Sequence, residues 1–179
     1  MTIGIDISQL AYPSKTGVYN YLYNLVAKLL EDDKKNNYVL FFSSLRRSLP
    51  SAVEAKFKNS KNVEIKKYKF PPTFLDILWN IAHSFSINRL IGYTDVFLTS
   101  DWTEPPVSTG RKATIIYDLT VYKVPKEMDR KIIKTQRRKL KWVKKESSMI
   151  ICISESTKRD VREILGIEKE RLNVIYPGL

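Results

Sequence analysis

The chain alternates between short apolar runs and longer segments whose apolar residues recur at helical spacing. Residues 3–7 form an apolar, largely β-branched run, which is typical of a strand buried on both faces. From Val18 to Leu30 the apolar residues fall at intervals of three and four, and this spacing predicts a helix with one buried face. Ser14 or Thr16 can cap its first turn. The chain therefore begins with a strand–loop–helix unit.

The same alternation continues along the sequence. Apolar runs predict strands at residues 38–42, 63–68, 95–99, 113–117, 149–153 and 172–175, and helical spacing predicts helices at residues 51–57, 73–90, 129–147 and 155–165. The run 63–68 alternates apolar and polar residues, as a strand near the edge of a sheet does. Alternating strands and helices favour an α/β fold, a Rossmann-like, open, mostly parallel sheet with helices on both faces. Residues 1–179 are expected to form a single domain.

Composition and charge narrow the class of protein. An apolar fraction of 43% is that of a globular protein. No apolar run approaches the roughly 18 residues of a membrane span, and a strand starts too near Met1 to leave room for a signal peptide, so we expect a cytoplasmic protein. The net charge of +12 implies an anionic partner, which could be nucleic acid, an acidic membrane surface or a phosphorylated small molecule. Cys152 is expected in a buried strand, and the sole histidine, His83, is expected to be structural, so no metal site is predicted.

The distinctive polar residues follow the predicted strands. In an open parallel sheet, ligands bind outside the carboxyl ends of the strands, so the loops after Ile7, Thr99, Tyr117 and Ile153 are the candidate sites. Tyr117 and Asp118 end a buried strand, where a phenol and a carboxylate can face a cleft. Alternatively, Asp118 only caps the turn that follows.

Two predicted helices begin directly after strands and can bind anions. The unpaired N–H groups and positive dipole at such helix starts attract phosphates. At the first helix, Thr16 and Gly17 stand at this position, and Gly17 lets a ligand approach the backbone closely. At the later helix, Ser154 is a natural N-cap and is followed by Glu155 and Lys158. Capping alone accounts for Ser154, and anion binding is an addition to it.

Asp101, Trp102 and Glu104 stand together in the loop that follows the strand 95–99. Carboxylates beside an exposed aromatic ring can bind carbohydrate, because the ring covers a sugar face while the acids accept its hydroxyl groups. The alternative is that Trp102 folds back into the core.

The predicted helix 129–147 is strongly basic, with nine Lys or Arg and no acid between residues 130 and 145. One interpretation is a helix lying on anionic lipid, with Trp142 near the interface. Another is nucleic-acid binding. A plainly solvated helix surface is the third. The residues assigned to a membrane-facing surface are Lys134, Arg138, Lys141, Trp142 and Lys145.

Four motifs, in order, resemble the amino-terminal domain of family 4 glycosyltransferases, retaining enzymes of the GT-B fold. Ile3 to Asp6 and the helix start at Gly17-Val18-Tyr19-Asn20 are similar to the family's glycine loop and the helix after it. Residues 115–120 with Pro125 resemble its "HDLT…P" segment, residues 151–161 resemble "IxxSExSKxDL", and residues 173–178 resemble the strand and "YPG" turn that lead into a second domain. The resemblance covers essentially the whole chain.

The resemblance implies transfer of a hexose, such as mannose, from a nucleotide-sugar donor to a glycan or lipid-linked acceptor, as in polysaccharide biosynthesis. Thr16 and Gly17 would face the donor phosphates, and Ser154, Glu155 and Lys158 are assigned to the donor side as well. Tyr117 and Asp118 would face the transferred sugar as the catalytic pair. Asp101, Trp102 and Glu104 would face the acceptor. No cofactor or metal is implied, and a basic helix suits peripheral attachment to the inner face of the cell membrane.

Two departures from the family pattern matter. Tyr117 stands where the family commonly has His, which removes or alters any role of the imidazole. The chain also stops at Leu179, where the donor-binding domain is expected, so a missing domain or a partner subunit has to supply the donor site, and this chain alone is expected to catalyse little. The alternative function is a non-catalytic basic α/β module that docks on anionic membrane or nucleic acid, and of these two nucleic acid is the less favoured.

Overall fold

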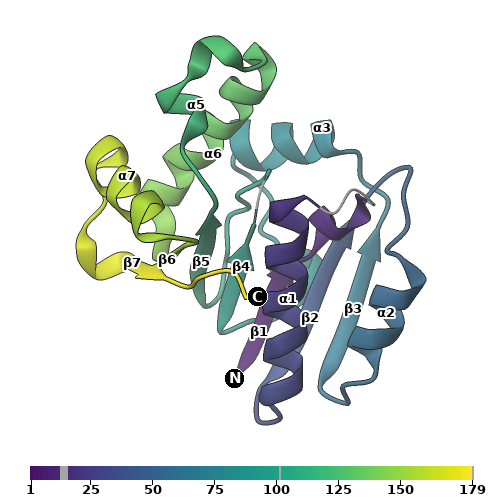
Figure 1. The fold of residues 1–179 in the computed structure, drawn as a ribbon. Coiled ribbons are helices and arrows are strands. Elements are labelled where there is room, and N and C mark those ends of the chain that lie inside the picture. The colour runs from purple at the N-terminus through teal and green to yellow at the C-terminus, as the bar shows by residue number, and fades with distance from the viewer. Residues whose placement is uncertain (13–15, 101, 179) are drawn as a thin grey trace.

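A computed structural model describes residues 1–12, 16–100 and 102–178 and contains a seven-stranded parallel sheet in the order β3-β2-β1-β4-β5-β6-β7 (Figure 1). The strands are β1 (Thr2–Asp6), β2 (Asn37–Ser43), β3 (Val63–Tyr68), β4 (Val96–Thr99), β5 (Arg111–Ile116), β6 (Ser147–Cys152) and β7 (Leu172–Val174). Every neighbouring pair is parallel. The predicted Rossmann-like α/β class is confirmed.

Helices cover both faces of this sheet. The α-helices are α1 (Gly17–Asp32), α2 (Ser51–Lys58), α3 (Pro72–Leu75), α4 (Asn88–Ile91), α5 (Thr120–Lys123), α6 (Arg130–Glu146) and α7 (Glu155–Leu165). The further elements η1 (Ser8–Ala11), η3 (Pro125–Glu127) and η4 (Lys169–Arg171) are 3-10 turns, and η2 (Asp76–Ile81) is a π-helix. The helices α1 and α2 cross between strands on one face, and α3, η2, α6 and α7 lie on the other (Figure 1).

The order of the strands creates a natural binding crevice. From β1 the chain moves outward through β2 to β3, then returns to the other side of β1 with β4 and continues to β7. The connections after β1 and β4 therefore leave the sheet in opposite directions, which opens a space at the carboxyl ends of these two strands. Between β4 and β5 the described residues contain no helix, and residues 102–110 run as a loop.

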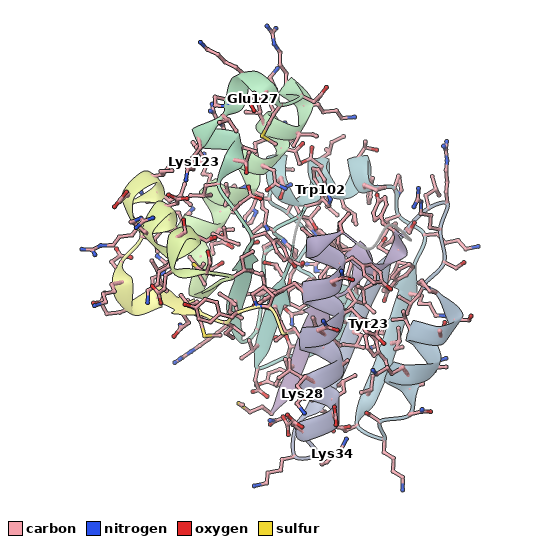
Figure 2. The ribbon with its side chains drawn as sticks, viewed as in Figure 1. Tyr23, Lys28, Lys34, Trp102, Lys123 and Glu127 are labelled. Atoms are coloured by element: carbon pink, nitrogen blue, oxygen red, sulfur yellow. The ribbon has the colours of Figure 1, made fainter. Side chains whose placement is uncertain are left out.

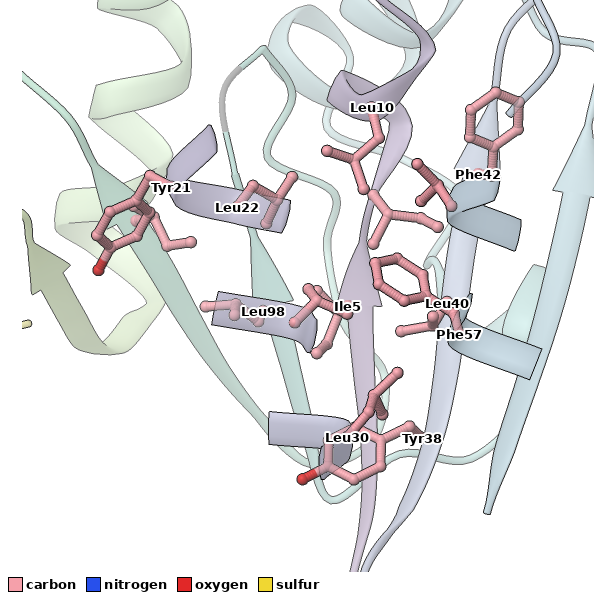
Figure 3. Close-up of a cluster of buried hydrophobic side chains, with 14 of the residues drawn as sticks. Ile5, Leu10, Tyr21, Leu22, Leu30, Tyr38, Leu40, Phe42, Phe57 and Leu98 are labelled. Carbon is pink, nitrogen blue, oxygen red and sulfur yellow. The ribbon is translucent and has the colours of Figure 1, made fainter. Parts of the chain in front are cut away.

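Three apolar clusters hold the helices to the sheet. The largest packs α1 and α2 against the central strands and includes the fully buried Ile5, Leu22, Leu40 and Phe57 (Figure 3). A second lies beneath α6 and α7, and a third packs Trp79 of η2 against β2 and β4. Burial of this apolar area is the main favourable contribution to folding, at roughly 25 cal/mol per Å².

Most of the predicted elements are present near their predicted bounds. The strand 63–68 and the helix 155–165 have the predicted ends, and β3 is an edge strand as its alternating pattern indicated. Cys152 is a fully buried strand residue, as expected. Ser14, one of two predicted caps of α1, lies outside the described residues, and the other, Thr16, accepts a hydrogen bond from the backbone N–H of Tyr19 at 3.3 Å.

The predicted long helix at residues 73–90 is wrong. The segment divides into α3, η2 and α4, and His83 and Phe85 adopt left-handed backbone angles with φ of 47° and 63°. The indole N–H of the buried Trp79 donates to the carbonyl of Phe85 at 3.0 Å, so this side chain holds the chain in its reversal. The apolar residues whose spacing suggested this helix do not form one buried face, because Phe74 and Ile77 are exposed.

Glycine is required at the turn before β5. Gly110 has a φ of 79°, and an added Cβ would lie 2.1 Å from the carbonyl oxygen of Thr94. Gly110→Ala should therefore lower the free energy of unfolding by at least about 3 kcal/mol, from backbone strain and overpacking together. Gly92→Ala is the matched control, because Gly92 has a φ of 85° with no atom near its Cβ position, and it should lose only about 1–2 kcal/mol. Equal losses in urea-induced unfolding would contradict the packing constraint at Gly110.

Candidate functional site

A cavity of about 300 Å³ lies at the carboxyl ends of β1 and β4, where the strand order reverses. Its walls come from the β1 loop with η1, from α3, from the β4 loop and from the start of α6. The lining residues are Asp6, Ser8, Gln9, Tyr12, Pro72, Thr73, Leu75, Asp76, Ser100, Trp102, Thr103, Lys131, Ile132 and Thr135. The cavity combines an aromatic ring with carboxylates and hydroxyl groups, a combination that binds polar organic ligands with apolar faces.

Asp6 lines this cavity and is only 8% exposed. Its carboxylate accepts a hydrogen bond from the backbone N–H of Ser8 at 2.9 Å. Burial raises the pKa of Asp6 above its ordinary value, and the positive charge of Lys139 opposes this effect in part. Asp6 is not among the site residues predicted from the sequence, although a carboxylate at the end of a buried apolar strand is a visible signal.

Trp102 forms the aromatic wall of the cavity. Its side chain is 37% exposed, so it does not fold fully into the core (Figure 2). The amide of Asn80 holds the backbone of this loop, because its Nδ2 donates to the carbonyl of Trp102 at 2.9 Å. The same amide donates at 2.8 Å to Asp76, a second carboxylate lining the cavity. Asp101, which we predicted beside Trp102, lies outside the described residues.

Glu104 does not face this cavity, contrary to its predicted role in binding the acceptor. It is fully buried, and its carboxylate accepts hydrogen bonds from the hydroxyl groups of Thr99 at 2.7 Å, Thr114 at 2.9 Å and Ser147 at 3.2 Å. Its own backbone N–H donates to Asn80 at 3.0 Å. A buried carboxylate needs such partners, and the strand hydroxyl groups supply them. Glu104 therefore ties the cavity loop to the sheet.

A chain of buried charges extends from Glu104. Lys112 lies 3.7 Å from Glu104 and 2.6 Å from Glu146, and its side chain is fully buried. Glu146 also lies 2.8 Å from Nε2 of His83, whose ring stacks on Trp142 with ring centroids 3.5 Å apart. The predicted structural role of His83 is confirmed, because the histidine links η2 to the end of α6.

A second cavity of about 170 Å³ adjoins the first and contains both residues of the predicted catalytic pair. The phenol of Tyr117 is buried and lies 2.8 Å from the hydroxyl of Ser100, which lines the first cavity. Asp118 is exposed and accepts a hydrogen bond from the backbone N–H of Thr120 at 2.8 Å, so it does cap the turn. Val18 of α1 and Trp102 also line this cavity, which brings the start of α1 to the same place.

The two helix starts that we predicted as anion sites lie in different surroundings. Thr16 caps α1, and Gly17 is exposed with no atom near its Cβ position. Ser154 caps α7 by accepting from the backbone N–H of Thr157 at 3.1 Å. Glu155 and Lys158 line a separate hollow on the outer side of α7, so they do not join the two cavities described above.

A comparison with known protein families identifies the family of this chain. The family model of Glycosyltransferase Family 4 matches residues 15–179. The chain belongs to glycosyltransferase family 4. No curated protein matches the chain at a significant level. In the described part of this family 4 domain, no group of three or more His, Cys, Asp and Glu side chains could hold a metal ion.

The basic helix of this family 4 domain is α6, and its predicted membrane-facing residues separate into two groups. Arg138 pairs with Asp76 at 2.8 Å, and the indole N–H of Trp142 donates to the carbonyl of Asn80 at 2.9 Å, so these two side chains hold α6 to η2. The other three side chains, Lys134, Lys141 and Lys145, are exposed. Among the described residues, no helix has both the length and the apolar character needed to cross a bilayer.

The buried carboxylate of Asp6 predicts a pH dependence of stability. Because its pKa is raised in the folded state, the folded chain binds this proton more tightly than the unfolded chain, and stability falls as the pH rises from the ordinary carboxyl value through the raised one. Asp6→Asn keeps the hydrogen bond to Ser8 and removes the charge. Its unfolding free energy should exceed that of the wild type at neutral pH, and the difference should vanish near pH 3.8. A difference that is constant from acid to neutral pH would show that burial of the charge is not the cause.

Removal of the carboxylate of Glu104 should be costly, because it leaves three buried hydroxyl groups and one side of Lys112 without their acceptor. Glu104→Ala is expected to lower the free energy of unfolding by about 3–5 kcal/mol. Glu168→Ala is the control, since the side chain of Glu168 is 68% exposed in its pair with Arg171, and its denaturation midpoint should stay nearly unchanged. Similar midpoints for the two variants would mean that Glu104 does not anchor the loop.

Proposed function

We propose that this family 4 domain binds the acceptor of a sugar transfer in the cavity between β1 and β4. The observation that carries the proposal is the position of that cavity, with Asp6, Asp76 and Trp102 in its walls, in a chain that belongs to glycosyltransferase family 4. The ring of Trp102 can cover the apolar face of a sugar, while the two carboxylates accept its hydroxyl groups. The exposed part of Trp102 leaves its ring accessible to such a ligand.

We propose that the sugar donor binds at the smaller cavity beside the first one. Asp118 is exposed there and can accept a hydroxyl group of the transferred sugar, whereas the buried phenol of Tyr117 orients Ser100 between the two cavities. The start of α1 at Thr16 and Gly17 adjoins this cavity through Val18. Its free N–H groups suit the diphosphate of a nucleotide-sugar donor. The hollow at Glu155 and Lys158 lies apart, so we do not include it in this site.

The proposed reaction moves a hexose to an acceptor hydroxyl group. The acceptor oxygen forms a bond to the anomeric carbon of the sugar as the bond from that carbon to the donor phosphate breaks. The nucleoside diphosphate leaves with the bonding electron pair, and the acceptor proton passes to its phosphate oxygen. A second domain or a subunit that holds the nucleotide completes the site, as the family resemblance implies. The two cavities share the side chain of Trp102, so acceptor and donor sugar would meet beside it.

Substitution of Trp102 tests the acceptor site. The chain is applied to an array of immobilised mono- and oligosaccharides, and the glycans that bind are titrated by saturation-transfer NMR. Trp102→Ala should weaken binding about tenfold, or about 1.4 kcal/mol, because the stacked ring is lost.

Tyr93→Ala is the matched control. Tyr93 is 62% exposed and precedes the amino end of β4, whereas the cavity lies at its carboxyl end. The glycan binding of this variant should equal that of the wild type. The proposal fails if the wild type binds no glycan of the array, or if Trp102→Ala binds as tightly as Tyr93→Ala.

A further inference from the structure

The segment that contains α3 and η2 exposes a line of large apolar side chains. These are Phe74, Ile77, Ile81 and Phe85, with exposed fractions of 45%, 56%, 51% and 41%, and we call them the apolar ridge. The opposite side of the same segment buries Leu75 and Trp79 in the core. Leu75 and Trp79 supply the buried contacts of this segment, whereas the ridge residues keep about half of their surface exposed. A cluster of exposed apolar residues in a stable domain indicates a contact surface.

The fold holds the ridge in a defined position. The left-handed backbone angle of Phe85, unfavourable for a bulky residue, is held by the hydrogen bond from Trp79. Asn80, between Ile77 and Ile81, donates through its side chain to Asp76 and accepts through its carbonyl from Trp142. The ridge is therefore a fixed surface built on the core.

Basic side chains border the ridge. The helix α6 packs against η2, and the ammonium groups of Lys141 and Lys145 lie 5.7 and 5.1 Å from the ring centroid of Trp142, the residue that contacts η2. Lys134 is exposed one turn before Arg138, which pairs with Asp76 of η2. At the far end, the guanidinium of Arg89 lies 5.5 Å from the ring centroid of Phe85.

The neighbouring acids do not cancel this charge. Asp76 is paired with Arg138, and Glu146 is paired with Lys112 and His83. In the described part of the chain, whose net charge is +12, no ion pair includes Lys134, Lys141 or Lys145. An apolar strip bordered by uncompensated cations matches a bilayer surface that presents acyl chains beneath anionic headgroups.

We infer that the apolar ridge and the exposed lysines of α6 form a docking surface for an anionic lipid bilayer. The aliphatic side chains of Ile77 and Ile81 insert at the level of the headgroups, and Lys141 and Lys145 contact lipid phosphates. A nucleic acid would use the lysines but would leave the aliphatic side chains without a partner. Docking on a bilayer is a function in addition to sugar transfer, and it does not depend on that reaction.

Docking has one consequence for the proposed acceptor cavity. Thr73 and Leu75, the neighbours of Phe74 in the chain, line that cavity. A bilayer in contact with Phe74 therefore lies beside the cavity wall, which suits an acceptor whose sugar is carried by a lipid. This consequence, unlike the docking surface, rests on the proposed function.

Vesicle co-sedimentation of the 179-residue chain tests the docking surface. The probes are vesicles of phosphatidylcholine alone and vesicles that also contain phosphatidylglycerol, at low and high salt. The wild type should bind only the anionic vesicles and should release them as salt screens the lysines. The double variant Lys141→Gln/Lys145→Gln should bind about thirtyfold more weakly, because each basic residue at an anionic surface strengthens binding about fivefold. The double variant Ile77→Ser/Ile81→Ser should lose on the order of tenfold.

Matched controls use residues of the same types away from the ridge. Lys35→Gln/Lys61→Gln removes two exposed lysines at the amino-terminal edge of the sheet, and Met149→Ser/Ile164→Ser removes two apolar side chains of β6 and α7 that are each 39% exposed. Both should bind like the wild type. The inference is overturned if the wild type does not bind anionic vesicles, if the isoleucine variant binds as the wild type does, or if the control lysine pair loses as much as Lys141 and Lys145. It is also overturned if size-exclusion chromatography shows a dimer that only the isoleucine variant dissociates, because the ridge would then contact a second copy.

Discussion

The carboxylate of Glu104 lies fully buried among hydroxyl groups from β4, β5 and β6. Among its described residues, the β4–β5 connection contains no helix, and polar contacts hold it to the sheet together with the packing of Val107 on the core. The side chain of Asn80 joins the backbone on both sides of Thr103, through the carbonyl of Trp102 and the N–H of Glu104. One anchored loop thus couples the wall of the main cavity, the buried pair with Lys112 and the position of η2.

The polar network around η2 and the apolar surface of η2 have different roles. On its inner side, η2 contributes Trp79 to the core and Asp76 to the cavity. On its outer side it presents aliphatic residues beside the lysines of α6. One short segment therefore contacts the candidate sugar site and the candidate membrane surface, and the π-helical winding, which is common at functional sites, places both sets of side chains.

The fold could be predicted from the sequence because strand runs and helix caps are local signals. The run 63–68 and the helix at residues 155–165, with Ser154 as its cap, needed no tertiary information. The segment 73–90 failed because it is apolar on two sides, and spacing alone does not tell a buried side from an exposed one. Of the residues predicted for the acceptor site, Trp102 lines the cavity, whereas Glu104 is buried in the sheet. The sequence could not show this burial, because the hydroxyl groups that bind Glu104 come from strands far apart in the sequence.

An NMR titration of the isotopically labelled chain with simple hexose glycosides tests directly whether the main cavity binds carbohydrate. We expect the backbone amide shifts to concentrate around Asp6, Asp76, Ser100 and Trp102, at the carboxyl ends of β1 and β4. The amides at the amino ends of the strands should stay unchanged. Shifts that are absent from these residues, or that concentrate instead on the outer side of α7, would contradict a carbohydrate site in this cavity.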